Sequence, residues 1–177
     1  MHHYKIVIAD DHPLFRAALK QAVSEAARHV EIVEVSTMSE LQDRTSEHND
    51  ADLVLLDLTM PGASGFSSLV YLKGQIPEMP VVVVSGNEDH SVIRRSIEYG
   101  ALGFIPKSVA LETMVKAVQA ALEGEAWIPE DVSLDAPVVD DKEAKVAEGI
   151  ASLTPKQFRV LVMLMQGLLN KQIAYEL

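Results

Sequence analysis

The feature that most constrains the fold is an alternation of short aliphatic runs with segments of helical periodicity. Four of the five runs are almost wholly apolar, which is typical of strands covered on both faces of a parallel sheet. The second run alternates apolar and acidic residues, so we expect it at an edge of the sheet. The runs are residues 5–10, 31–35, 53–57, 80–85 and 102–106.

Between these runs, apolar residues recur at the spacing of a helix face. Ser39 and Gln42 indicate a capping box at the start of one of these helices. Five β-α units joined by right-handed crossovers give a doubly wound α/β sheet. We predict a flavodoxin-like (βα)5 fold with a parallel sheet of strand order 2-1-3-4-5, which places the topological switch point between strands 1 and 3. The other predicted helices are 14–27, 66–72, 92–99 and 111–122.

The chain is expected to divide into three parts. Residues 1–123 hold the α/β domain. Residues 124–152 are acidic and contain two prolines, so we interpret them as a linker that is helical in part near 140–150. Residues 153–177 begin a separate, all-helical segment.

The helical segment carries clear start signals. Thr154 followed by Pro155 and Gln157 is typical of an N-cap, a first-turn proline and a capping box. Gly167 is expected to end this helix and Asn170 to cap a last one. The apolar stripe of the first helix consists of Phe158, Leu161, Val162 and Met165.

Composition narrows the possible functions. There are 26 acidic and 15 basic residues, a formal net charge of −11, so the chain as a whole should be repelled by nucleic acid. Cysteine is absent, which excludes disulfides, thiolate metal sites and cysteine nucleophiles. No apolar run approaches the ~18 residues of a membrane span, and the N-terminus does not resemble a signal peptide. We therefore expect a cytoplasmic protein with no membrane partner.

Acidic residues follow two strands that the predicted topology makes neighbours. Strand 1 ends in Asp10 and Asp11, and strand 3 ends in Asp57. Two like charges ~4 Å apart repel by ~4 kcal/mol at an effective dielectric of ~20, so three clustered carboxylates need a counter-charge. Oxygen-only ligands favour Mg²⁺, and Mg²⁺ suggests phosphate chemistry.

The ends of strands 4 and 5 add groups that suit a phosphoryl ligand. Ser85 offers a hydroxyl and Lys107 a mobile positive charge. A carboxylate can act as a nucleophile and form an aspartyl-phosphate, and Asp57 is the candidate because Asp10 and Asp11 share the metal. Taken singly, each of these residues is more often a turn, cap or surface residue. Their coincidence at one sheet edge favours the functional interpretation.

The motifs I-A-D-D-H-P, L-L-D-L-T-M-P-G, V-V-V-V-S-G and G-F-I-P-K-S resemble the receiver domain of bacterial two-component response regulators over roughly residues 4–123. The stretch that begins L-T-P-K-Q-F-R-V-L is similar to the start of a LuxR-type helix-turn-helix, as found in the NarL/FixJ subfamily of transcription regulators.

The resemblance implies roles for individual residues. Asp57 would accept a phosphoryl group from a sensor histidine kinase, with Mg²⁺ held by Asp11, Asp57 and the carbonyl of Thr59, and by Asp10 through water. Ser85 and Lys107 would bind phosphoryl oxygens. Phe104 matches the switch aromatic of the family, although an ordinary core aromatic is an equal alternative. Such a protein assists its own phosphorylation and dephosphorylation and is not a turnover enzyme.

The expected role of the protein in transcription follows from the resemblance to a LuxR-type helix-turn-helix. The complete protein is expected to bind promoter DNA, and a second copy of the chain is a further candidate partner. Residues 170–177 would form only the first helix of the helix-turn-helix, and the segment 153–177 carries a net charge of only +2. We therefore expect the recognition helix to be absent and DNA binding by this chain to be weak or none.

Two alternatives compete with this hypothesis. The first is a receiver that acts only through protein contacts, by kinase competition or dimerisation. The second is a phosphotransferase of the haloacid dehalogenase kind, which needs a second Asp two residues after the nucleophile, where this chain has Thr59.

Overall fold

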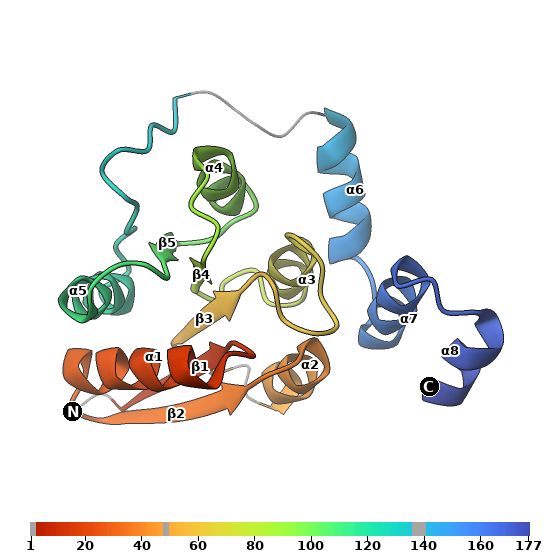
Figure 1. Ribbon diagram of the computed structural model, residues 1–177, viewed down its shortest axis with the longest axis horizontal. Helices are drawn as coiled ribbons and strands as arrows, with labels where there is room; N and C mark the ends of the chain where they lie inside the picture. Colours follow the sequence, from red (N-terminus) through yellow and green to blue (C-terminus); the bar gives the residue numbers. More distant parts are fainter. Residues whose placement is uncertain (1–2, 48–49, 136–140) are drawn as a thin grey trace.

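The computed structural model describes residues 3–47, 50–135 and 141–177 (Figure 1). At its centre is a five-stranded sheet in which all neighbouring strands are parallel, in the order β2-β1-β3-β4-β5. The predicted fold class is confirmed, and the run that alternates with acids is an edge strand as expected. The strands are β1 (Tyr4–Ala9), β2 (Val30–Val35), β3 (Leu53–Asp57), β4 (Val81–Ser85) and β5 (Gly103–Pro106).

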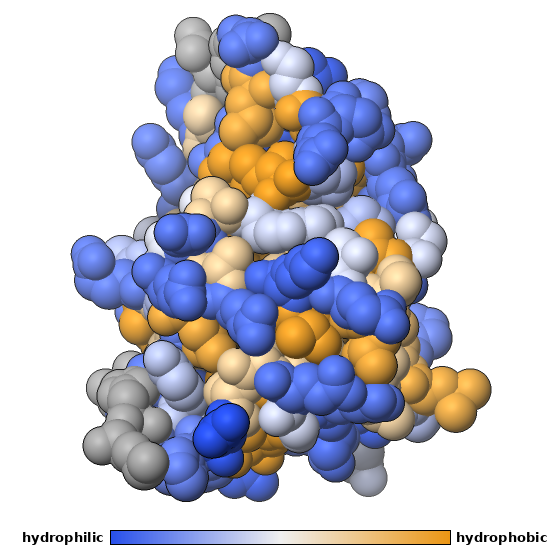
Figure 2. Space-filling view, turned by 90° about the vertical axis from the view of Figure 1, so that its left-hand side faces the viewer, coloured by the Kyte–Doolittle hydropathy of each residue, from blue (hydrophilic) through white to orange (hydrophobic). Residues whose placement is uncertain are grey.

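Helices cover both faces of the sheet (Figure 1). The first and fifth helices pack on one face, and the second, third and fourth pack on the other. Seen from the left-hand side of Figure 1, the molecule is covered mostly by hydrophilic residues in its middle and lower parts (Figure 2). The helices are α1 (Pro13–Ala26), α2 (Met38–Glu47), α3 (Ser67–Gln75), α4 (His90–Glu98), α5 (Leu111–Leu122), α6 (Asp141–Ala151), α7 (Pro155–Met165) and α8 (Asn170–Glu176).

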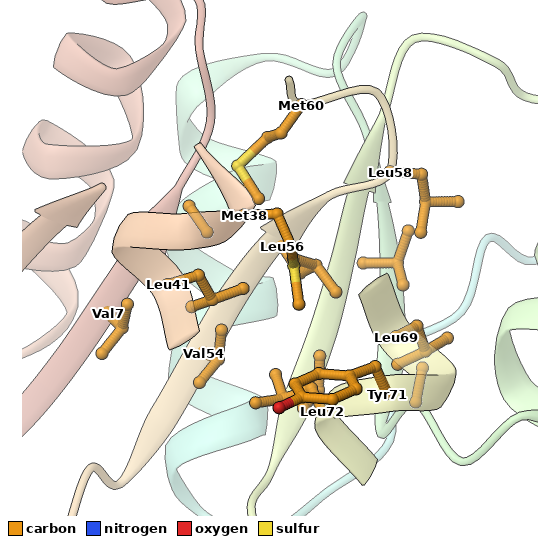
Figure 3. Close-up of a cluster of buried hydrophobic side chains, with 14 of the residues drawn as sticks. Val7, Met38, Leu41, Val54, Leu56, Leu58, Met60, Leu69, Tyr71 and Leu72 are labelled. Atoms are coloured by element: carbon orange, nitrogen blue, oxygen red, sulfur yellow. The ribbon is translucent and has the colours of Figure 1, made fainter. Parts of the chain in front are cut away.

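The apolar strands supply side chains to two separate cores. Val54 and Leu56 of β3 point into the core beneath α2 and α3 (Figure 3), whereas Leu53 and Leu55 point into the core beneath α1 and α5. Successive side chains of a strand face opposite sides of the sheet, so a strand covered on both faces must be apolar throughout. Full burial of each such side chain contributes roughly 1.5–3 kcal/mol. A carboxylate in this run is therefore costly anywhere except at its end.

The start of α2 corrects one local prediction. Ser39 does not cap this helix: Thr37 Oγ1 accepts the Glu40 N–H at 3.2 Å, and the Glu40 carboxylate accepts the Ser36 N–H at 2.7 Å. Thr37 and Glu40 have the same three-residue spacing as the predicted pair. The earlier start also buries Met38, which is 2% exposed, against the turn at Pro61, whose carbonyl accepts the Met38 N–H at 2.9 Å.

The segment that follows α5 lies against the α/β domain. The Trp127 carbonyl accepts the N–H of Phe104, at the free edge of β5, at 2.9 Å. A Cβ on Gly103 would lie 2.6 Å from the same carbonyl oxygen, so only glycine allows this approach. The predicted linker thus lies against the sheet edge at Trp127, and its expected helical part is α6.

The last three helices lie beside α2 and α3 (Figure 1). The predicted capping box of α7 is confirmed, because Thr154 Oγ1 accepts the Gln157 N–H at 3.3 Å and the Gln157 side chain accepts the Thr154 N–H at 2.9 Å. Gly167 follows α7 with a φ of 78°, as expected for a helix end. The last helix starts at Asn170, with Leu169 rather than Asn170 in the capping position.

The Phe158 side of α7 is covered by the α/β domain. Phe158 is fully buried and its ring centroid lies 4.5 Å from that of Tyr71 in α3. Within the described ranges, no helix is both long and apolar enough to cross a membrane.

Candidate functional site

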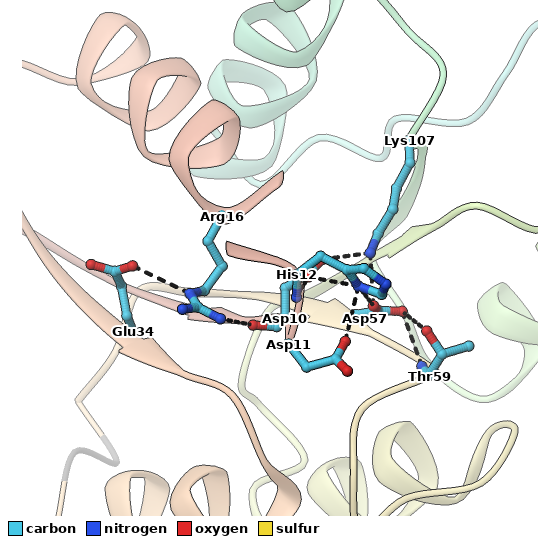
Figure 4. A network of polar contacts seen from close by, with 8 residues as sticks. All are labelled: Asp10, Asp11, His12, Arg16, Glu34, Asp57, Thr59 and Lys107. Carbon is cyan, nitrogen blue, oxygen red and sulfur yellow. Dashed lines mark hydrogen bonds and ion pairs between the residues drawn. The ribbon is translucent and has the colours of Figure 1, made fainter. Parts of the chain in front are cut away.

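The carboxyl ends of β1, β3 and β5 bring three charged side chains together. Asp10 follows β1, Asp57 is the last residue of β3, and Lys107 follows β5 (Figure 4). The Lys107 Nζ lies 2.6 Å from Asp10 Oδ2 and 2.7 Å from Asp57 Oδ2. Both carboxylates are buried, at 0% and 1% side-chain exposure, so the ammonium is essential to their charge balance.

Asp57 is held by the residue two positions ahead. Its Oδ1 accepts hydrogen bonds from the Thr59 N–H at 3.0 Å and from the Thr59 hydroxyl at 2.8 Å. Two donors therefore contact one oxygen of the carboxylate, and the Lys107 ammonium contacts the other. The Thr59 hydroxyl contact was not predicted, since the sequence resemblance assigned only the Thr59 carbonyl.

His12 lies at the surface, with 61% side-chain exposure, and it also contacts the acidic residues. Its Nδ1 lies 2.9 Å from Asp11 Oδ1 and 3.3 Å from Asp10 Oδ1. The ring leans over the acidic residues because the backbone turns sharply here, where Asp10 Oδ1 accepts the His12 N–H at 2.7 Å. The D-D-H sequence itself is the signal that could have indicated this contact.

The acidic cluster fits a hard divalent cation. Asp10, Asp11, His12 and Asp57 can each offer one ligand atom, and these atoms all lie within 4.8 Å of one another. Asp10 Oδ2 and Asp11 Oδ1 are buried oxygen atoms, which lie 2.6 Å from Lys107 Nζ and 2.9 Å from His12 Nδ1, respectively. Three carboxylates against one lysine leave an excess of negative charge, which a divalent cation would offset.

Ser85 is the last residue of β4, whereas Phe104 lies within β5. Ser85 is 2% exposed, its Oγ accepts the Asn87 N–H at 3.1 Å, and its carbonyl accepts the Lys107 N–H at 2.8 Å. Its side chain lines a cavity of about 980 Å³ together with those of Thr59, Lys107 and Phe15. Phe104 is fully buried in the core beneath α3 and does not line this cavity.

Two α1 residues that the sequence did not single out support the site. Arg16 donates from Nη1 to the Asp10 carbonyl at 2.7 Å, and its Nε lies 3.4 Å from Glu34 (Figure 4). The Phe15 ring lies under Lys107, with its centroid 4.8 Å from Nζ. Both residues lie in the first turn of α1, which begins after the acidic residues. Their helical spacing from Asp11 and His12 is the sequence signal that could have indicated these contacts.

A parallel sheet of this order with two buried carboxylates and a lysine at its carboxyl edge defines a response regulator receiver. The family model for the response regulator receiver domain matches residues 6–119, and that for bacterial regulatory proteins of the luxR family matches residues 151–177. The chain belongs to the NarL/LuxR family of two-component response regulators, whose members are not turnover enzymes.

Curated relatives span nearly the whole chain. The glycerol metabolism activator of Pseudomonas putida is 38% identical over 179 residues, which cover 98% of this chain and 81% of that protein. The nitrate/nitrite response regulator protein NarL of Escherichia coli (strain K12) is 31% identical over 173 residues, covering 97% and 80%.

Solved structures agree with this family. A LuxR family DNA-binding response regulator from Silicibacter pomeroyi is 35% identical, with a TM-score of 0.63 over 72% of this chain and 98% of that one. RcsB from Salmonella enterica serovar Typhimurium, bound to promoter P1flhDC with the phosphomimetic BeF3-, is 26% identical, with a TM-score of 0.67 over 99% and 83%.

Proposed function

We propose that this chain is a phosphorylation-switched transcription regulator in which Asp57 accepts a phosphoryl group from a sensor histidine kinase. The observation that carries the proposal is the contact of the Lys107 ammonium with two buried carboxylates, at 2.6 and 2.7 Å, on the wall of an open cavity. A buried nucleophile beside a fixed cation suits phosphoryl transfer, in which catalysis rests on positioning and charge stabilisation.

In the proposed transfer, a carboxylate oxygen of Asp57 attacks the phosphorus atom of a phosphohistidine. The P–N bond breaks, the imidazole nitrogen keeps the bonding electrons, and an acyl phosphate forms on Asp57. Lys107 moves from the carboxylates to a phosphoryl oxygen. The Ser85 hydroxyl, on the same cavity, donates to a second phosphoryl oxygen.

Asp11, Asp57 and the Thr59 carbonyl would hold Mg²⁺, with Asp10 contributing through water. The ion, when bound, supplies positive charge that stabilises the phosphoryl oxygens during transfer. The carboxylates orient it, and Arg16 fixes the backbone at Asp10 through its 2.7 Å contact with the Asp10 carbonyl.

We also propose that Phe104 acts as the switch aromatic, which lies inward when the Ser85 hydroxyl is drawn to a phosphoryl group; its ring is buried here. It is linked to the output segment through its N–H bond to the Trp127 carbonyl. The proposed functional division is a receiver over 1–123, a connecting segment over 124–152 and the LuxR-type segment over 153–177.

Direct DNA binding by this chain is proposed to be weak. Arg159, one of three basic residues in 153–177, donates to Gln42 at 3.1 Å and lies 3.3 Å from Asp43, so its charge is engaged by the receiver. That contact also favours a second candidate, in which the chain acts only through protein contacts, as a kinase competitor or in a homodimer. Fluorescence anisotropy with promoter DNA, before and after phosphorylation of a chain extended through a complete LuxR-type recognition helix, distinguishes the two.

The first test is intact mass after incubation with acetyl phosphate, with and without Mg²⁺. We expect one phosphoryl group on the wild-type chain only when Mg²⁺ is present, and none on Asp57→Asn. Asp135→Asn, which changes an exposed aspartate, is the matched control and should be phosphorylated normally. Equal labelling of the Asp57 variant and the wild type would refute the assignment of the nucleophile.

A further inference from the structure

The position of Lys107 depends on more than its two carboxylate partners. Its side chain has four methylene groups, and such chains lose rotamer freedom when they are fixed in one position. The Nζ nevertheless lies between Asp10 and Asp57 with only 16% side-chain exposure. When a phosphoryl group replaces a carboxylate as its partner, something else must keep the ammonium in place.

The Phe15 ring is placed to do this. Its centroid lies 4.8 Å from the Lys107 Nζ, within the ~6 Å range over which a ring face attracts a cation. Phe15 belongs to the first turn of α1, whose preceding residues are the acids of the site. Its ring is partly buried against the core beneath α1 and α5, so its own position is fixed by packing.

The chemistry of an aromatic face suits this role. A ring face attracts the ammonium through its quadrupole but accepts no strong hydrogen bond from it. All three N–H donors of the lysine therefore remain available for oxygen atoms. A carboxylate or amide in this position would instead compete with the phosphoryl group for those donors.

We propose that Phe15 is a positioning residue that holds the Lys107 ammonium over Asp57, before and after Asp57 gains a phosphoryl group. This inference rests on the proposed function, because it assigns Lys107 to a phosphoryl oxygen. The competing explanation is that Phe15 only fills the core. Leucine keeps most of the apolar volume but not the ring, and tyrosine keeps both.

The first readout is the NMR signal of the lysine ammonium groups in the full chain. Protons over a ring face are shifted upfield, and an immobilised ammonium gives a signal that exchanges slowly with water. We expect one shifted lysine signal in the wild type, absent in Lys107→Arg, kept in Phe15→Tyr and moved to the ordinary lysine position in Phe15→Leu. A Lys107 signal that is equally shifted in Phe15→Leu would overturn the proposal.

The second readout is the initial rate of Mg²⁺-dependent phosphorylation by acetyl phosphate. We expect a decrease of roughly fivefold in Phe15→Leu, in line with a partly desolvated cation–ring contact, and a rate close to the wild type in Phe15→Tyr. Phe66→Leu makes the same exchange at the residue that precedes α3, where the ring centroid lies 5.3 Å from that of Tyr99, and should leave the rate unchanged.

The two readouts separate this inference from the proposed function. If the wild type is phosphorylated and Phe15→Leu matches it in rate, the positioning role is wrong while the phosphoacceptor stands. If no variant, including the wild type, gains a phosphoryl group, the proposed function fails, and the role of Phe15 in phosphoryl transfer fails with it. Equal slowing of Phe15→Leu and Phe15→Tyr would contradict the ring-specific role.

Discussion

At the scale of single residues, the site concentrates more negative charge than its neighbours balance. Lys107 faces two buried carboxylates, and Asp11 adds a third whose Oδ1 lies near His12. Like charges at these separations repel by amounts comparable with a large part of the stability of a small domain. The site is therefore expected to be a source of strain that a bound cation relieves.

Replacing Asp11 with asparagine tests this expectation. In EDTA, we expect Asp11→Asn to raise the free energy of unfolding by about 1 kcal/mol, because it removes one of three clustered negative charges at a partly exposed position. Added Mg²⁺ should stabilise the wild type and have little effect on the variant. Urea unfolding with and without Mg²⁺ measures both effects. The exposed Asp135→Asn is the control, and a less stable Asp11→Asn in EDTA would disprove the argument.

The residues of the site could be predicted from the sequence as far as the ends of the strands could be predicted. Asp10, Asp57, Ser85 and Lys107 each follow an apolar run, and the parallel topology alone brings strand ends to one edge. The Thr59 hydroxyl, the Nδ1 of His12 and the ring of Phe15 were not predicted as contacts. Their positions depend on the course of the turns after β1 and β3, and sequence periodicity does not describe those turns.

At the scale of secondary-structure elements, the packing of α6 on α3 depends on a glycine. A Cβ on Gly74 would lie 2.3 Å from the Ala151 carbonyl oxygen and 2.6 Å from its Cα, closer than real Cβ contacts. The Gln75 side chain donates to the Ala151 and Leu153 carbonyls at 3.3 and 3.0 Å, which satisfies the end of α6. The two helices therefore fit together only with a bare backbone at this position.

Gly74→Ala should consequently destabilise the protein. Alanine normally stabilises a helix by ~1 kcal/mol relative to glycine, but here we expect a loss of roughly 1–3 kcal/mol from overpacking. Gly149→Ala in α6 is the matched control, because a Cβ there meets nothing within 4 Å, and it should stabilise. Thermal unfolding of both variants measures whether each substitution lowers or raises the stability of the protein. Stabilisation of both proteins would show that α6 does not pack this closely.

The pKa of Tyr99 also depends on the position of α6 against the receiver. Its burial, together with a hydrogen bond from its hydroxyl to Glu143 in α6 and the charge of that glutamate, raises the pKa of Tyr99 to about 12 from 10.0. The folded state thus favours the protonated phenol. The resulting stabilisation is complete below pH 10 and is lost as the pH rises from 10 to about 12.

Absorbance titration of the phenolate, compared with Tyr99→Phe to assign its transition, measures this pKa. We expect Glu143→Gln to move the pKa toward 10 without reaching it, since burial is the largest cause of the shift. Glu112→Gln on the exposed side of α5 is the control and should leave it unchanged. A Tyr99 pKa that is the same in the wild type and in Glu143→Gln would exclude the α6 contact.

At the scale of the whole molecule, the receiver and the LuxR-type segment pack together more closely than the sequence indicated. The sequence predicted the five β-α units, the α7 capping box and an apolar stripe on α7. It left open what covers that stripe, because an apolar face shows that a partner exists without showing which one. In the structure the partner of Phe158 is Tyr71 of α3, and Arg159 contacts Gln42 of α2. Val162 of the stripe is also buried, whereas Met165 is 60% exposed.

Phe158 is the centre of this contact, so its removal should separate the segment from the receiver. The ring is fully buried, and loss of such a ring usually costs about 3–5 kcal/mol, more than the polar contacts of Arg159 at the edge can offset. We expect Phe158→Ala to increase the radius of gyration in small-angle X-ray scattering and to speed tryptic cleavage after Lys156 and Arg159. Leu164→Ala, at a position 51% exposed, should change neither. Phosphorylation of Phe158→Ala by acetyl phosphate should persist, because none of the described site residues contacts Phe158. An unchanged radius of gyration in Phe158→Ala would instead mean that the polar contacts alone hold the segment in place.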